Sequence, residues 1–171
     1  MIVADKIAEW LEQKAITHSF GIIGGGNVVL WDAIAKRGFT KLICVHHEQA
    51  AAMAAAYYYR TSGRLSLCLV TTGAGSSNVI TGVLAAYMDR VPLLVISGNE
   101  ASYHMEKKTR VWGVQGYGSV EVADGITKWS MRMGMEFPVS AQLSAMRRIA
   151  MEPPFGPVWF DIPKDIQGAM A

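Results

Sequence analysis

A glutamate between an apolar segment and an alanine-rich segment is the first candidate for chemistry in this sequence. Glu48 follows LICVHH and is itself followed by QAAAMAAA. A carboxylate at a helix N-terminus is stabilised by the helix dipole, which would be a purely structural reason for its presence. The apolar surroundings indicate a second role, because a buried carboxyl group resists ionisation and can share a proton with a partner base. The residues alone allow both interpretations.

Two glycine-rich segments are the next candidates. The first contains Gly24, Gly25 and Gly26, and the second is GAGSSN at residues 73–78, directly after the strongly apolar residues 65–72. Glycines let the chain turn sharply and let a flat ligand lie against bare backbone. Neither segment has the GxGxxG or GxxxxGK[ST] spacing of common phosphate-binding loops. Each is therefore either a ligand contact or a plain tight turn.

Several basic side chains lie near these segments or in a later polar stretch. His46 and His47 are interpreted as strand-end residues that help to place Glu48, and a proton-transfer role is the alternative because histidine titrates near neutral pH. His104 and Arg110 are candidates for binding a carboxylate, and solvated loop positions are the alternative.

Helical and strand-like hydropathy patterns alternate along the chain. Helices are expected at residues 3–15, 28–37 with Asn27 as N-cap, 48–60, 79–88 and 140–151. Strands are expected at residues 19–23, 41–47, 65–72, 92–97, 128–133 and 158–162, with loops at 73–78 and 100–118.

This alternation predicts an α/β fold. Continuous apolar strands between helices indicate a single three-layer domain over residues 1–171, with a mostly parallel sheet of about six strands and helices on both faces. Ligands of such folds bind at the carboxyl ends of the strands. We therefore expect the loops after Ile23, His47 and Thr72 to meet at one site.

The composition limits the class of protein. Hydrophobic residues make up 51% and charged residues 18%, and the formal net charge is +2, which predicts no special attraction to nucleic acid or membrane lipid. The charged start is not a signal peptide, and no uncharged apolar run approaches the ~20 residues of a membrane helix, so a cytoplasmic location is expected. Cys44 and Cys68 are expected to be buried free thiols, and no cluster of residues predicts a metal site on this chain.

Taken together, these segments resemble acetolactate synthases and their relatives, the large family that uses thiamine diphosphate to ligate or decarboxylate 2-oxo acids. The resemblance runs from SFGIIGGGNVVLWDAI, through the block from HHEQAAAM to VPLLVISGN, to FGPVWFDIPKD. It covers essentially all 171 residues.

The resemblance implies roles for individual residues. The Glu48 carboxyl is expected to hydrogen-bond N1′ of the cofactor's aminopyrimidine ring and so activate the cofactor. Gly25 and Gln115 are expected on the substrate side. Ile23 and Ala74 stand where the family usually has proline. The expected cofactor contacts are Ile23, Gly24, Glu48, Thr72, Gly73, Ala74, Gly75 and Asn78.

The resemblance also implies a partner. The chain has no GDG motif, with which the family holds magnesium and the cofactor's diphosphate. We expect a diphosphate-binding subunit to supply the binding site for both groups. The two subunits would form a heteromer, such as a dimer of heterodimers or a larger assembly. The start at a methionine and the end soon after DIPKD favour a natural split gene, with an engineered fragment as the alternative.

The expected function is that of a subunit of a thiamine-diphosphate-dependent carboligase acting on a 2-oxo acid. The first alternative is the alpha subunit of a split 2-oxo acid decarboxylase of the sulfopyruvate or phosphonopyruvate type. The second is a non-catalytic paralogue, against which Glu48 argues, because a scaffold has no use for a buried acid.

Overall fold

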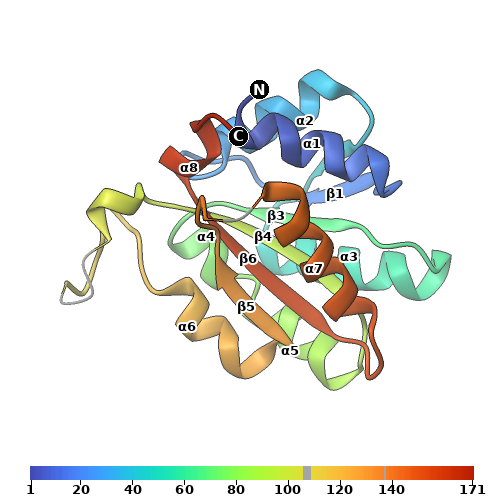
Figure 1. Cartoon of the computed structure of the whole chain (residues 1–171). Coiled ribbons are helices and arrows are strands. Elements are labelled where there is room, and N and C mark those ends of the chain that lie inside the picture. The colour runs from blue at the N-terminus through green and yellow to red at the C-terminus, as the bar shows by residue number, and fades with distance from the viewer. Residues whose placement is uncertain (106–108, 137) are drawn as a thin grey trace.

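The computed structural model describes residues 1–105, 109–136 and 138–171, and these form a parallel sheet between two layers of helices (Figure 1). Six strands pair in the order β2-β1-β3-β4-β6-β5, and the five pairings between these strands are parallel. The strands are β1 (His18–Gly21), β2 (Lys41–Cys44), β3 (Leu67–Val70), β4 (Leu93–Asn99), β5 (Trp129–Arg132) and β6 (Pro157–Pro163). The predicted α/β fold is confirmed.

Helices cover both faces of the sheet (Figure 1). One face carries α1 (Val3–Gln13), α2 (Val28–Arg37), α7 (Val139–Met151) and the short α8 (Lys164–Gly168). The other carries α3 (Glu48–Ser62), α5 (Ile80–Met88) and α6 (Ser119–Ala123). Three short segments complete the described helices: α4 (Ala74–Ser77), η1 (Ser102–His104) and η2 (Asp124–Ile126).

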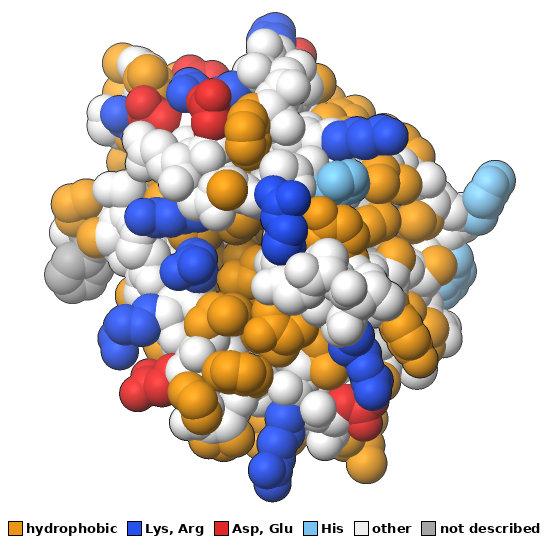
Figure 2. Space-filling view, turned by 90° about the vertical axis from the view of Figure 1, so that its right-hand side faces the viewer, with side chains coloured by type: hydrophobic (Ala, Val, Ile, Leu, Met, Phe, Trp, Pro, Cys, Tyr) orange, Lys and Arg blue, Asp and Glu red, His pale blue; other side chains and the backbone are white. Residues whose placement is uncertain are grey.

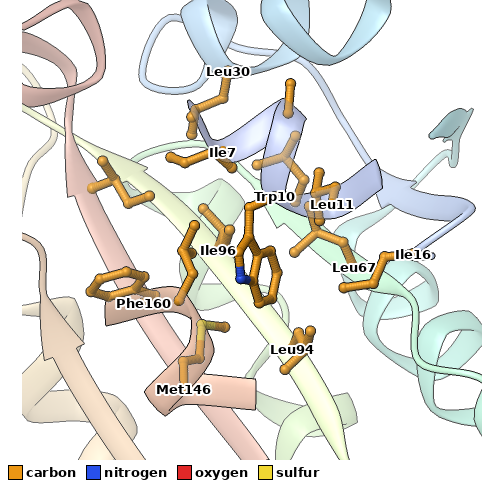
Figure 3. Packing of buried hydrophobic residues seen from close by; sticks show 14 of the residues in the cluster. Ile7, Trp10, Leu11, Ile16, Leu30, Leu67, Leu94, Ile96, Met146 and Phe160 are labelled. Atoms are coloured by element: carbon orange, nitrogen blue, oxygen red, sulfur yellow. The ribbon is translucent and has the colours of Figure 1, made fainter. Parts of the chain in front are cut away.

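The larger part of the core lies under α1. Ile7, Trp10 and Leu11 recur with the period of one helix face and point towards Leu67, Leu94, Ile96 and Phe160 of the sheet (Figure 3). The Trp10 indole donates a hydrogen bond of 3.1 Å to Ser144 of α7, so its one polar group is satisfied. Burying a large side chain of this kind contributes about 1.5–3 kcal/mol, and these contacts anchor α1 on the sheet.

On the opposite face, α3 and α5 pack closely because their contact surface consists of small residues. Ala51, Ala52 and Ala55 are fully buried. A Cβ atom on Gly82 would lie only 2.6 Å from the Cβ of Ala52, so no larger residue fits there without a shift of the helices. This packing fixes the first turn of α3, which carries Glu48.

Some sequence predictions need correction. The strand expected at residues 41–47 ends at Cys44, and the Cys44 side chain is exposed, whereas Cys68 in the sheet interior is buried as expected. The reason is that β2 is an edge strand that pairs with β1 alone. The expected loop at 73–78 contains the helical turn α4, and the expected loop at 100–118 contains η1, with residues 106–108 outside the described residues.

The end of the sheet at which the strands begin has a mixed surface. In Figure 1 the strands run from right to left, so their carboxyl ends lie on the left and Figure 2 shows the opposite end. Lys and Arg side chains are spread over that end among hydrophobic and neutral ones, with few acidic residues (Figure 2). Within the described ranges, no helix combines the length and apolarity needed to cross a bilayer.

Candidate functional site

Glu48 is the first residue of α3 and lies beyond the carboxyl end of β2. Its N-cap is His47, whose Nδ1 accepts a hydrogen bond of 3.2 Å from the Gln49 amide. The Glu48 side chain is buried, with 8% of its surface exposed, and its Oε2 accepts a hydrogen bond of 2.9 Å from the Asn78 amide group. Oε1 accepts no hydrogen bond from the described part of the chain. One oxygen of the carboxyl group is therefore held, and the other is left for a ligand.

The thiol of Cys68 is an additional group near this carboxylate. Burial raises the pKa of Cys68, and the negative charge of Glu48 raises it further. The thiol therefore stays neutral at physiological pH and places no second negative charge beside Glu48.

The turn after β3 brings bare backbone to Glu48. Gly73 has a positive φ of 67°, which a glycine adopts without strain. A Cβ atom on Gly75 would lie 2.5 Å from Cγ2 of Thr71 and 3.3 Å from Oε1 of Glu48. A side chain at this position would therefore crowd both Thr71 and this carboxyl oxygen. Ala74, between the two glycines, is exposed.

The turn after β1 lies against the turn after β3. The Gly26 amide donates a hydrogen bond of 3.0 Å to Thr71 Oγ1, and a Cβ atom on Gly26 would lie 1.9 Å from Thr72 Oγ1. A Cβ atom on Gly24 would likewise lie 2.6 Å from Thr71 Oγ1. Gly25 has no such neighbour within 4 Å. The two turns are thus joined through Gly24 and Gly26, while Gly25 faces open space.

Asn27 organises the first turn from within. Its Oδ1 accepts a hydrogen bond of 2.8 Å from the Gly24 amide, and its Nδ2 donates one of 3.1 Å to the Ile22 carbonyl. The prediction that Asn27 is the N-cap of α2 is confirmed for its position, but its side chain makes no capping hydrogen bond. The side chain instead closes the turn that carries the three glycines. Ile23 in the same turn is 48% exposed.

A later segment closes over the second turn. The side-chain amide of Gln115 donates a hydrogen bond of 3.2 Å to the Thr72 carbonyl. The Tyr117 hydroxyl lies 3.0 Å from the Ser76 hydroxyl, which also bonds the Gly73 carbonyl at 3.0 Å. Burial raises the pKa of Tyr117 despite the hydrogen bond with Ser76, so its hydroxyl keeps its proton at neutral pH.

The structure therefore gathers the residues expected at the site on two joined turns, the start of α3 and one loop. The remaining candidates His46, His104 and Arg110 are exposed and outside these contacts. Sequence reasoning missed Thr71, Tyr117 and the turn-closing role of Asn27. Each is a neighbour of a predicted residue, but only the folded contacts between separate segments show what it does.

A parallel α/β sheet with a buried carboxyl group and two glycine-rich turns at its strand ends is typical of domains that bind a ligand there. The sequence model of the thiamine pyrophosphate enzyme N-terminal TPP binding domain matches residues 1–117. This chain belongs to the thiamine pyrophosphate enzyme family, as an N-terminal domain of the acetolactate-synthase-like kind.

Similar proteins extend the match to nearly the whole chain. The acetolactate synthase large subunit of Buchnera aphidicola from Schizaphis graminum is 33% identical over 95% of the chain and 28% of its own length. The isozyme 1 large subunit of Escherichia coli K12 is 32% identical over 98% of the chain and 29% of its length. The chloroplastic acetolactate synthase of Arabidopsis thaliana is 29% identical over 98% of the chain and 24% of its own length. The chain thus spans about a quarter to three tenths of these relatives.

Proposed function

We propose that this chain is the aminopyrimidine-binding part of a thiamine-diphosphate-dependent carboligase that acts on a 2-oxo acid. The observation that carries the proposal is the environment of the Glu48 carboxyl group. This carboxyl group is buried, is held at Oε2 by Asn78, and has Oε1 3.3 Å from the position that a Cβ atom on Gly75 would take. A carboxyl group in this setting can hold a proton at a ring nitrogen of a bound ligand.

The two turns beside Glu48 depend on glycine. At Gly24, Gly26, Gly73 and Gly75 a Cβ atom would come within 3 Å of a neighbouring atom, so the adjoining segments pack closely there and no larger residue fits without a shift. When bound, thiamine diphosphate supplies the electron sink that decarboxylation of a 2-oxo acid requires. The proposed contacts with the cofactor are Ile23, Gly24, Glu48, Thr72, Gly73, Ala74, Gly75 and Asn78, and those on the substrate side are Gly25 and Gln115.

The proposal includes a second protein part. The sequence contains no GDG motif, and the relatives are more than three times as long as the matched region, since that region is 28% of the Buchnera subunit. We propose that a diphosphate-binding partner subunit supplies the site for magnesium and the cofactor's diphosphate, in a heteromer. The free thiols of Cys44 and Cys68 support a cytoplasmic location, where cysteines stay reduced.

The test is an assay of the chain together with the product of a neighbouring gene that encodes a GDG motif. We expect thiamine-diphosphate-dependent release of carbon dioxide from pyruvate or another 2-oxo acid, and a loss of at least about a hundredfold in Glu48→Gln. The matched control is Glu152→Gln, because Glu152 is an exposed residue whose carboxyl group pairs with Arg148 of α7. Equal activity of the two variants, or activity without the cofactor, would overturn the proposal.

Product analysis separates ligation from simple decarboxylation. The names of the relatives favour ligation, because the three described above are acetolactate synthases or their large subunits. We therefore expect a new carbon–carbon bond in the product. A free aldehyde as the sole product would instead assign the chain to a split decarboxylase.

A further inference from the structure

The carboxyl ends of β4 and β6 are joined by a row of polar contacts that the proposed chemistry does not use. Asp161 of β6 is fully buried. Its Oδ1 accepts a hydrogen bond of 2.8 Å from Ser97, and its Oδ2 accepts one of 2.9 Å from Asn99. Arg132 of β5 donates a further bond of 2.8 Å to Oδ2. A buried carboxylate is stable only when it is satisfied in this way, so the site holds these three side chains in fixed positions.

Two charged residues just after β6, Lys164 and Asp165, make further contacts with the segment that follows β4. Lys164 Nζ donates a hydrogen bond of 2.8 Å to Oε2 of Glu100. The Asp165 carboxyl accepts hydrogen bonds of 2.8 Å from the Ser102 amide and 2.5 Å from the Ser102 hydroxyl. Residues 161–165 therefore hold residues 97–102 through charged or ionic hydrogen bonds, which are stronger than neutral ones.

Residues 97–102 in turn hold a small hairpin at residues 112–117. Trp112 and Gly116 exchange backbone hydrogen bonds of 2.9 and 2.8 Å. The Glu100 carboxyl lies inside this hairpin, so that a Cβ atom on Gly113 would come within 2.8 Å of it. Asn99 Nδ2 donates a bond of 3.1 Å to the Tyr117 carbonyl.

A second path reaches the hairpin from Asp161. The Arg132 guanidinium that bonds Asp161 also lies over the Trp112 ring, with its Cζ 4.8 Å from the ring centroid. A cation over the face of tryptophan is attracted to the ring, so this contact holds the base of the hairpin as well.

The hairpin then contacts the turn beside Glu48. Gln115 bonds the Thr72 carbonyl at 3.2 Å, and Tyr117 lies 3.0 Å from the Ser76 hydroxyl. We propose that residues 161–165 are a positioning element, which fixes the 112–117 hairpin and through it holds the 72–76 turn in the shape that binds the cofactor. The role of the turn rests on the proposed function, whereas the physical coupling from Lys164 to the turn does not.

The coupling is tested by hydrogen exchange on the protein as expressed, with Lys164→Met as the variant. Lys164 is suitable because its side chain is 42% exposed, so its loss removes the bond to Glu100 without opening the core. We expect the Ser76 and Ser77 amides, which bond the Gly73 carbonyl, to exchange about tenfold faster, the scale set by loss of one charged hydrogen bond. Amides of α7 are expected to keep their rates.

Lys36→Met is the matched control, because Lys36 forms an exposed pair with Asp32 far from the turn. Lys164→Arg keeps the charge and should restore most of the protection. Unchanged exchange at Ser76 and Ser77 in Lys164→Met, or an equal rise in α7, would overturn the inference.

In the active complex, the apparent affinity for thiamine diphosphate should fall in Lys164→Met while kcat at saturating cofactor stays near the parent value. A fall in kcat alone would contradict a positioning role. A protein without thiamine-diphosphate-dependent activity, but with faster exchange at the turn in Lys164→Met, would refute the proposed function and leave the positioning element established.

Discussion

The side-chain amide of Asn78 donates a hydrogen bond of 2.9 Å to Oε2 of Glu48, across a separation of 30 residues in the sequence. This contact connects the start of α3 to the residue that follows α4. Asparagine suits the position because its amide donates a hydrogen bond without adding a charge beside the buried carboxyl group.

An aspartate at this position would test the relationship directly. In Asn78→Asp two carboxyl groups would share one partly buried space, so we expect a loss of about 1–3 kcal/mol in the free energy of unfolding near neutral pH. Part of the loss should disappear on acidification, because protonation of one of the two carboxyl groups removes the repulsion. Urea denaturation of variant and parent at neutral and at acidic pH measures this, with Asn78→Ala as a control that removes the hydrogen bond without adding a second charge and whose deficit should change less with pH. A pH-independent deficit in Asn78→Asp would show that the two carboxyl groups do not interact.

The three consecutive glycines are expected to differ in their tolerance of a side chain. A Cβ atom on Gly26 would lie 1.9 Å from Thr72 Oγ1, whereas Gly25 has nothing within 4 Å. Gly26→Ala should therefore destabilise the domain by about 1–3 kcal/mol, and Gly25→Ala should change its stability by less than about 0.5 kcal/mol. Thermal unfolding followed by circular dichroism compares the two. Equal losses would mean that the two turns are not in the close contact described.

The features that follow from local pattern could be predicted from the sequence. Helical and strand-like hydropathy patterns alternate along the chain, and they predict the strands, the principal helices and the α/β class. The structure confirms these features. A candidate site could be placed at the strand ends because the chain after each of three strands carries residues suited to ligand contact. Glu48 was identified through its position between an apolar strand and an alanine-rich helix.

Features set by contacts between distant segments could not be predicted. The exposure of Cys44 follows from the place of β2 at the edge of the sheet, and the strand order was not predicted. The partners of the Asn27 side chain exist only once the glycine turn has formed. Asp161 and Asn99 are 62 residues apart, and no local pattern indicates that they share a hydrogen bond.

The two cysteines are expected to differ in reactivity. Cys44 is exposed, whereas Cys68 is fully buried and its pKa is raised by burial and by the charge of Glu48. Because the thiolate is the reactive species, only Cys44 should react with Ellman's reagent in the native protein, and both should react after denaturation in guanidinium. The Cys44→Ser variant should show no reactive thiol until it is unfolded. Rapid reaction of a native thiol in that variant would contradict the burial of Cys68.

The ion pair of Glu100 and Lys164 predicts how stability depends on pH. The hydrogen bond from Lys164 lowers the pKa of Glu100 below its ordinary value of 4.5, against the opposing effect of burial, and the charges of Lys164 and His104 and the Val114 amide act in the same direction. Because the folded pKa is the lower one, the stabilisation is fully present above the unfolded value and is lost as the pH falls through the folded value.

Glu100→Gln should isolate this contribution. Its free energy of unfolding should be lower than that of the parent protein at about pH 7, and the difference should shrink as the pH falls through the lowered folded pKa of Glu100, where Glu100 of the parent also becomes neutral. A series of urea denaturation curves over this range gives the difference at each pH. Glu152→Gln serves as the control, since an exposed pair such as Glu152 with Arg148 is worth little, and its difference should stay near zero throughout. A deficit of Glu100→Gln that is constant over the whole range would mean that the residue stabilises the 112–117 hairpin by its shape and not by its charge.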